Sequence, residues 1–111
     1  MVILAVDPQP SDLEHLVQCL KCAYPQSRVL PFSDPLLAYQ YGFNNAVDSV
    51  YTVKHMKRLD GMGLANMLRK KHPAIQVCFV TGKTAKQSAV LLQFGRWIHK
   101  PITVQAILAP N

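Results

Sequence analysis

The chain has 111 residues, of which half are hydrophobic and 16% are charged, a composition typical of one globular domain and not of a disordered segment. Twelve Lys and Arg against six Asp and Glu give a formal net charge of +6, which favours acidic partners without identifying them. No apolar run approaches the roughly 20 residues of a transmembrane helix, and the N-terminus lacks the basic start of a signal peptide. We therefore expect a single cytoplasmic domain over residues 1–111 that makes no contact with a membrane.

The first half of the sequence alternates short apolar runs with amphipathic segments. Residues 2–6 are continuously apolar, which is typical of a strand covered on both faces, and residues 10–24 carry an apolar stripe at helical spacing. Residues 28–33 predict a strand at the edge of the sheet, because Pro31 has no N–H for a neighbouring strand. Asp34 and Pro35 predict the start of a second helix, which we expect Gly42 with Asn44 and Asn45 to end, and residues 48–53 predict a third strand.

The second half continues the same alternation. Residues 61–72 predict a helix with a basic C-terminus, 75–80 a strand and 84–94 a weaker helix. Residues 96–99 predict a short last strand, and the rest of the chain has room for two helical turns at most. Strands that alternate with helices indicate a parallel sheet covered by helices on both faces. The sequence therefore predicts one doubly wound α/β domain.

The cysteines do not suggest a metal or redox site. Cys19 and Cys22 have the C-x-x-C spacing, but no second Cys or His pair completes a tetrahedral zinc site. The pair also lies inside a helical pattern, where small packed side chains are the simpler interpretation.

Short motifs lie near the ends of the predicted strands. They are residues 3–7, Leu59-Asp60-Gly61, Phe79-Val80-Thr81-Gly82, Gly95 and residues 97–101. Over nearly the whole chain this pattern resembles the receiver domain of two-component response regulators. Residues 32–38 and 79–82 most resemble receivers that are joined to LytTR-type DNA-binding domains. The resemblance implies a flavodoxin-like fold with five parallel strands in the order 2-1-3-4-5, here with a short or truncated last helix. It also implies a role in transcription regulation, with a DNA-binding output domain outside this chain.

In the family that the chain resembles, clustered carboxylates perform the chemistry. Two acids after the first strand and an Asp at the end of the third bind Mg²⁺, and that Asp accepts a phosphoryl group from a histidine kinase. A Thr or Ser after the fourth strand and a Lys before a cis proline contact the phosphoryl group. An aromatic side chain in the fifth strand changes rotamer to transmit the signal.

The acidic part of this pattern is largely missing here. Asp7 matches the first acid, but Pro8 stands where the second is expected and Val53 stands at the phosphoacceptor position. Valine has no nucleophilic atom, so an aspartyl phosphate of the family type cannot form there. One carboxylate is also a poor Mg²⁺ site, and we expect no cofactor. Basic residues surround the position instead: Lys54, Lys57, Arg58, Lys83 and Lys100.

Four other family positions are retained, whereas Lys57 replaces the proline that the family usually has four residues after the acceptor. Thr81 matches the hydroxyl, Lys100 the lysine, Pro101 the cis proline and Trp97 the switch aromatic. We therefore expect a degenerate receiver, a pseudo-receiver, which is not an enzyme and which signals through protein contacts. By the resemblance, its partner or a second copy would bind the face formed by the 84–94 helix and the last strand. That face includes Leu92, Phe94 and Trp97.

Two alternatives stay open. In the first, the relic site binds an anion through Thr81, Gly82, Lys83 and Lys100. In the second, the chain is a conventional phosphorelay receiver and Val53 is misaligned. The nearest acids are Asp48 and Asp60, neither of which can reach the strand end without breaking the pattern, and His55 is expected to be a solvent-facing loop residue.

Overall fold

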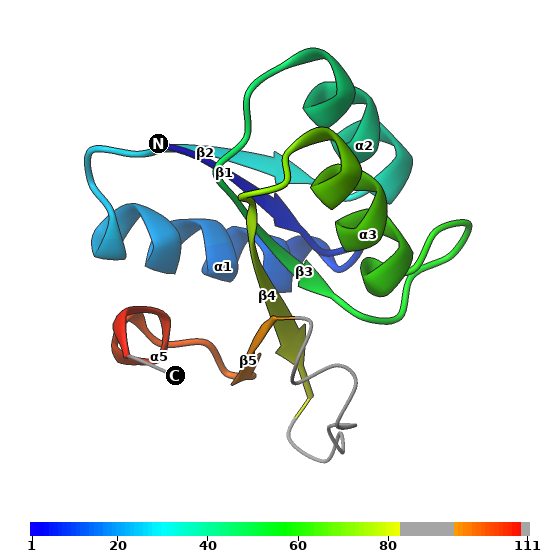
Figure 1. Ribbon diagram of the computed structural model, residues 1–111. Coiled ribbons are helices and arrows are strands. Elements are labelled where there is room, and N and C mark those ends of the chain that lie inside the picture. Colours follow the sequence, from blue (N-terminus) through cyan, green and yellow to red (C-terminus); the bar gives the residue numbers. More distant parts are fainter. Residues whose placement is uncertain (83–94, 110–111) are drawn as a thin grey trace.

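The computed structural model describes residues 1–82 and 95–109 and contains one sheet flanked by helices (Figure 1). All neighbouring strands are parallel, in the order β2-β1-β3-β4-β5. The predicted fold class and strand order are therefore confirmed, whereas the helix predicted for 84–94 lies outside the described residues. The elements are β1 (Val2–Val6), α1 (Pro10–Ala23), β2 (Arg28–Phe32), α2 (Pro35–Asn44), β3 (Ser49–Val53), α3 (Gly61–Lys71), β4 (Gln76–Thr81), β5 (Arg96–His99) and α5 (Val104–Leu108).

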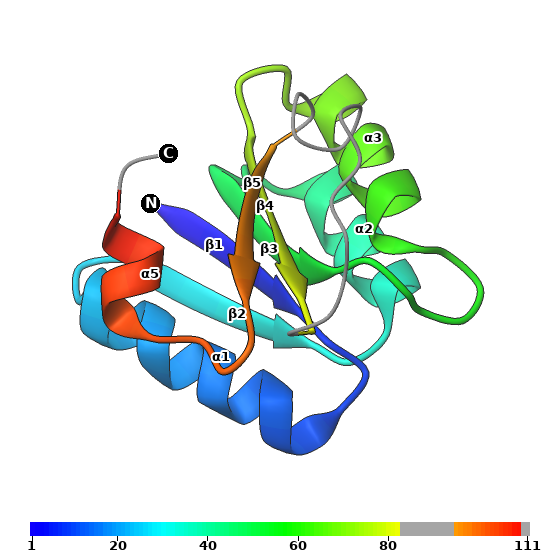
Figure 2. The same cartoon turned by 90° about the horizontal axis from the view of Figure 1, so that it is seen from below.

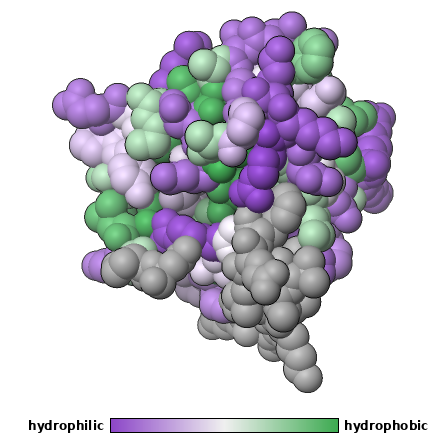
Figure 3. Space-filling model, in the orientation of Figure 1, coloured by the Kyte–Doolittle hydropathy of each residue, from purple (hydrophilic) through white to green (hydrophobic). Residues whose placement is uncertain are grey.

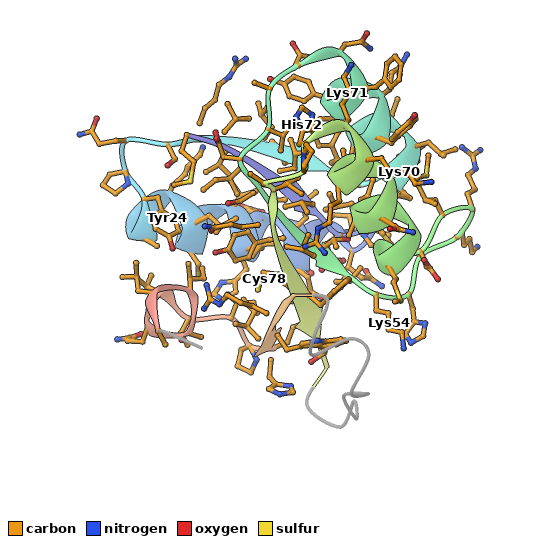
Figure 4. The ribbon with its side chains drawn as sticks, viewed as in Figure 1. Tyr24, Lys54, Lys70, Lys71, His72 and Cys78 are labelled. Carbon is orange, nitrogen blue, oxygen red and sulfur yellow. The ribbon has the colours of Figure 1, made fainter. Side chains whose placement is uncertain are left out.

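Helices cover both faces of the sheet. α1 and α5 lie on one face, while α2 and α3 lie side by side on the other (Figure 2). Successive residues of each central strand point to opposite faces, so β1 contributes Ile3 and Ala5 to one apolar cluster and Leu4 and Val6 to the other. Cys78 of β4 is buried in the first cluster (Figure 4). None of the described helices has the length and apolarity that crossing a membrane requires.

The predicted edge position of β2 is confirmed. Among the described strands, β2 pairs only with β1, so its other side has no neighbouring strand. Pro31, which lacks an N–H, is tolerated in such an edge strand. The predicted start of α2 is also confirmed, because the Asp34 side chain accepts a hydrogen bond of 2.9 Å from the Leu36 N–H and Pro35 is the first helical residue.

The predicted end of the second helix, at Gly42 with Asn44 and Asn45, is confirmed for the two asparagines, since Asn45 is the C-cap, but not for Gly42. α2 continues to Asn44, and Gly42 is a buried helical residue that faces α3. A Cβ atom at this position would collide with the Leu68 side chain, and the Gly42 carbonyl accepts a hydrogen bond of 2.6 Å from His72 Nε2. The glycine therefore serves a close contact between two helices, not a helix terminus.

The predicted short last helix is confirmed and has a specific anchor. A helix of five residues is not stable by itself in water. Here the Arg96 guanidinium of β5 donates hydrogen bonds of 2.9–3.1 Å to carbonyl oxygens of Ala106, Ile107 and Ala109. These bonds satisfy carbonyls that have no partner within the helix and fasten α5 to the edge of the sheet.

Candidate functional site

The carboxyl ends of the parallel strands meet at one edge of the sheet, the usual ligand-binding edge in open α/β folds. A pocket of about 280 Å³ lies there. Five of the predicted site residues line this pocket: Val53, Thr81, Gly82, Trp97 and Lys100. Lys83 lies outside the described residues. The pocket is lined by Val53, Lys54, His55, Val80, Thr81, Gly82, Trp97 and Lys100.

Val53 is the last residue of β3 and lies at the wall of this pocket. Its side chain is only 9% exposed and packs in the apolar cluster between the sheet and α1 and α5, which also contains Val80 and Ile102. The end of the central strand thus carries a hydrocarbon side chain that belongs to the core. It offers neither a nucleophile nor a metal ligand.

The two acids nearest in sequence are committed elsewhere. Asp48 precedes β3 at the opposite end of the sheet, where its Oδ2 accepts a hydrogen bond of 2.7 Å from the Val2 N–H. Asp60 caps α3, and its Oδ1 accepts a hydrogen bond of 2.7 Å from the Gly63 N–H. His55 is exposed in the β3–α3 loop. Both carboxylates therefore already accept a hydrogen bond from a backbone N–H.

Lys100 links two carboxylates at this edge. Its Nζ donates hydrogen bonds of 2.9 Å to Asp7 Oδ2 and 2.8 Å to Asp12 Oδ2. Asp7 is 1% exposed, and its other oxygen accepts from the Gln9 N–H at 2.9 Å. Burial of the ammonium lowers the pKa of Lys100, but the hydrogen bonds to Asp12 and Asp7 and their negative charges outweigh burial and raise the pKa above its ordinary value. The ammonium therefore pairs with both carboxylates at once and offsets part of their combined charge.

Sequence reasoning missed Asp12 as a member of the site. It was assigned only to the first helical turn, where an acid suits the helix dipole. The sequence did contain a signal for Asp12. Only three residues separate the end of β1 from Pro10, the first residue of α1, so the first turn of this helix places Asp12 near Asp7. The partner of Asp12 follows 88 residues later, so it could not be recognised from local pattern.

The other retained residues have different surroundings. Thr81 is buried, and its Oγ1 shares a hydrogen bond of 2.9 Å with Nδ1 of His99, a partner that the sequence did not suggest. The Trp97 ring lies 5.0 Å from the Phe79 ring, and its buried Nε1 has no hydrogen-bond partner within the part of the chain that the structure describes. The Lys100–Pro101 peptide bond is cis.

Comparisons with known proteins identify the fold. No family model matches the sequence, and no curated protein matches it. Among solved structures, a response regulator receiver domain from Clostridium thermocellum matches with a TM-score of 0.76 and 26% identity over 96% of this chain and 86% of that one. The chemotaxis protein CheY4 of Vibrio cholerae matches with a TM-score of 0.79 and 18% identity over 96% and 92%. The chain has the fold of response regulator receiver domains.

A third receiver with this fold allows a comparison of donor sets. The receiver domain of a sensor histidine kinase from Pseudomonas aeruginosa has a TM-score of 0.78 and 18% identity, covers 96% of this chain and 89% of its own, and holds a magnesium ion in its active-site cleft. In the present chain, few free oxygen ligands lie at this edge of the sheet. Pro8 and Val53 have no side-chain oxygen, and Lys100 Nζ already pairs with Asp7 and Asp12. No group of three His, Cys, Asp or Glu among the described residues is placed to hold a metal ion.

A larger cleft of about 660 Å³ borders the relic receiver site on the other side of the β3–α3 loop. The smaller pocket remains the better candidate site, because the predicted residues converge on it. The one acid in the larger cleft, Asp34, already caps α2 and pairs with Arg58 at 3.5 Å. The larger cleft is lined by Pro8, Ser33, Asp34, Pro35, His55, Met56, Lys57 and Arg58.

Arg58 holds a strained turn in this loop. Its φ of 73° lies in the left-handed region, and the flanking Leu59 N–H donates a hydrogen bond of 2.9 Å to the Lys57 carbonyl. A three-residue turn of this kind is unfavourable for a residue with a Cβ atom. The Arg58–Asp34 ion pair compensates little, because the arginine side chain is 68% exposed.

Replacement of Arg58 by glycine is therefore expected to raise the free energy of unfolding by about 1 kcal/mol, since glycine adopts positive φ without steric cost. Urea denaturation of wild type and Arg58→Gly measures the difference. Lys57→Gly is the matched control, because Lys57 in the same loop has no positive φ and its replacement is expected to destabilise slightly. A loss of stability in Arg58→Gly would contradict the strained turn.

Proposed function

We propose that this chain is a cytoplasmic pseudo-receiver that acts in signal transduction, and in transcription regulation, through protein contacts and without aspartate phosphorylation. The receiver fold supports the signalling role. The main support for the proposed loss of phosphorylation is Val53, because a buried hydrocarbon side chain ends β3.

Chemistry supports this proposal. Phosphoryl transfer to a receiver needs a carboxylate oxygen as nucleophile and a divalent cation to offset its charge. The two acids that remain nearby share Lys100, which supplies the positive charge that a cation would otherwise bring. A divalent cation would therefore have to displace a charged, hydrogen-bonded ammonium.

Treatment with a small phosphodonor tests the proposal. We expect the intact mass of the protein to stay unchanged after incubation with acetyl phosphate and Mg²⁺, because no nucleophilic carboxylate ends β3. A receiver with aspartate at this position, treated in parallel, is the positive control. A gain of one phosphoryl group, stable enough to be weighed and mapped to any residue of the chain, would overturn the proposal.

The anion-sensing alternative has weaker support. Lys100 is already paired with two carboxylates and Thr81 is hydrogen-bonded to His99, so neither donor is available without rearrangement. Partner binding at the face that includes Trp97 stays a prediction, because Leu92 and Phe94 lie outside the described residues. The switch role of Trp97 and the LytTR-type output domain also stay predictions.

A further inference from the structure

α2 leaves several large apolar side chains exposed. A surface helix normally turns its large apolar side chains toward the core. The residues that α2 buries fully are Pro35, Ala38 and Gly42, all of them small, while Tyr39 and Tyr41 are half-buried against the core. Leucine and phenylalanine side chains point outward, with Leu37 53% and Phe43 52% exposed. Five exposed large hydrophobic residues occur among the described residues, and α2 alone carries three of them: Leu36, Leu37 and Phe43.

Phe43 and the half-buried Tyr39 form one wall of a groove between α2 and α3. Leu36, Tyr39 and Phe43 are spaced by three and four residues, so they lie along one stripe of the helix. The Tyr39 and Phe43 rings are 6.0 Å apart. A hollow of about 360 Å³ lies between these rings and the residues of α3, and we call it the α2–α3 groove. Its lining residues are Tyr39, Phe43, Met67, Lys70 and Lys71.

Among the described residues, the α2–α3 groove is lined by positive side chains and by no negative one. Lys70 and Lys71 lie in the last turn of α3 (Figure 4), and Lys71 Nζ lies 5.0 Å from the centre of the Phe43 ring. Neither helix contains an Asp or Glu, because Asp34 and Asp60 precede the helices and cap their N-termini. Figure 3 shows hydrophilic and hydrophobic side chains next to one another over these two helices. The groove therefore combines an apolar hollow with the positive charges of Lys70 and Lys71.

We propose that the α2–α3 groove is the docking site for an acidic protein segment that carries an apolar anchor. The anchor fills the hollow between Phe43 and Met67, and carboxylates beside it pair with Lys70 and Lys71. Burial of outward apolar side chains provides the affinity, while the opposite charges orient the segment and speed its association. This surface is separate from the relic receiver site, so the proposal does not depend on the loss of phosphorylation.

Two other occupants fit the surface less well. Single-stranded nucleic acid stacks its bases on open ring faces, but Lys71 covers one face of Phe43 and Tyr39 meets that ring at 54°. A second copy of the chain would bring a further net charge of +6 to a basic surface. An acidic protein segment satisfies both the shape and the charge of the groove.

Selection from a displayed library of random linear peptides on the purified protein tests the proposal. We expect the selected peptides to combine Asp or Glu with Leu, Phe or Trp. Phe43→Ser should weaken their binding about tenfold or more, as expected for an anchor contact. The double variant Lys70→Glu, Lys71→Glu should weaken it to a similar degree, and most strongly at low salt. Fluorescence anisotropy with the labelled peptides measures these affinities, and amide NMR shifts locate the contact.

Matched controls lie on the opposite face of the sheet. Leu108→Ser removes an apolar side chain of α5 that is 53% exposed, and Lys21→Glu reverses an exposed charge in the last turn of α1. Both should leave peptide affinity within about twofold. The proposal is overturned if no peptides are enriched, if Phe43→Ser leaves binding unchanged, if an oligothymidine binds in place of the peptides, or if the protein self-associates through Phe43. None of these results bears on the phosphodonor experiment.

Discussion

Replacement of Lys100 by methionine is expected to lower the free energy of unfolding by about 3 kcal/mol at neutral pH, as for the removal of one partner from a buried ion pair. The reason is Asp7, which is 1% exposed and would lose its ion-pair partner and keep only the Gln9 N–H. Methionine keeps most of the length of the lysine stem, so the loss reflects charge more than packing.

Urea denaturation of wild type and Lys100→Met measures this loss. Lys21→Met is the matched control, because Lys21 is exposed on α1 and its replacement should change stability by less than about 0.5 kcal/mol. Asp12→Asn should cost less than Lys100→Met, since the Asp12 side chain is 46% exposed. A loss below about 1 kcal/mol in Lys100→Met would show that the ion pair does not hold Asp7.

The same pair predicts a pH dependence on the alkaline side. The pKa of Lys100 is raised in the folded state, so its contribution is complete below the unfolded lysine pKa of about 10.4 and is lost as pH rises through the folded value. Burial also raises the pKa of the Cys78 thiol to about 12, despite the nearby Arg96, so stability falls above the ordinary thiol pKa in both proteins. The difference between wild type and Lys100→Met isolates the lysine and should shrink only at the highest pH.

The features that could be predicted from the sequence are those that a few neighbouring residues determine. Pro31 placed β2 at the edge, Asp34 and Pro35 started α2, and Val53 ended β3, because each depends on backbone geometry or on the alternation of a few neighbouring residues. The errors and omissions depend on distant residues. Gly42 was grouped with the asparagines that end α2 because its contact with Leu68, 26 residues further along the chain, is invisible in local pattern, and Asp12 was missed because its partner is Lys100.

The outward apolar face of α2 escaped sequence reasoning for a related reason. A helix that contains Leu36, Leu37, Tyr39 and Phe43 appears apolar all round, which does not reveal the face that is buried. Only the close approach of α3 at Gly42 decides that the small residues face inward.

Replacement of Gly61 by alanine is expected to destabilise the protein by about 2–3 kcal/mol, in the upper range for overpacking. A Cβ atom at Gly61 would overlap the Val53 carbonyl oxygen and would lie 3.1 Å from the Lys54 Cα. Backbone atoms cannot rotate away as a side chain does. The Gly61 N–H also donates a hydrogen bond of 2.7 Å to the Lys54 carbonyl, so α3 cannot move away without breaking this bond.

Gly82→Ala is the matched control, because a Cβ atom there would meet no atom of the described residues within 4 Å. Its effect should stay within about 0.5 kcal/mol. Urea denaturation measures both variants, and amide NMR shifts should spread from Gly61 to Val53 and Lys54 but not to the α2–α3 groove. Equal stability of Gly61→Ala and Gly82→Ala would mean that the end of β3 tolerates a shift of α3. Val53 and Lys54 also line the relic site. In that case the start of α3 would not fix the backbone position of these two residues.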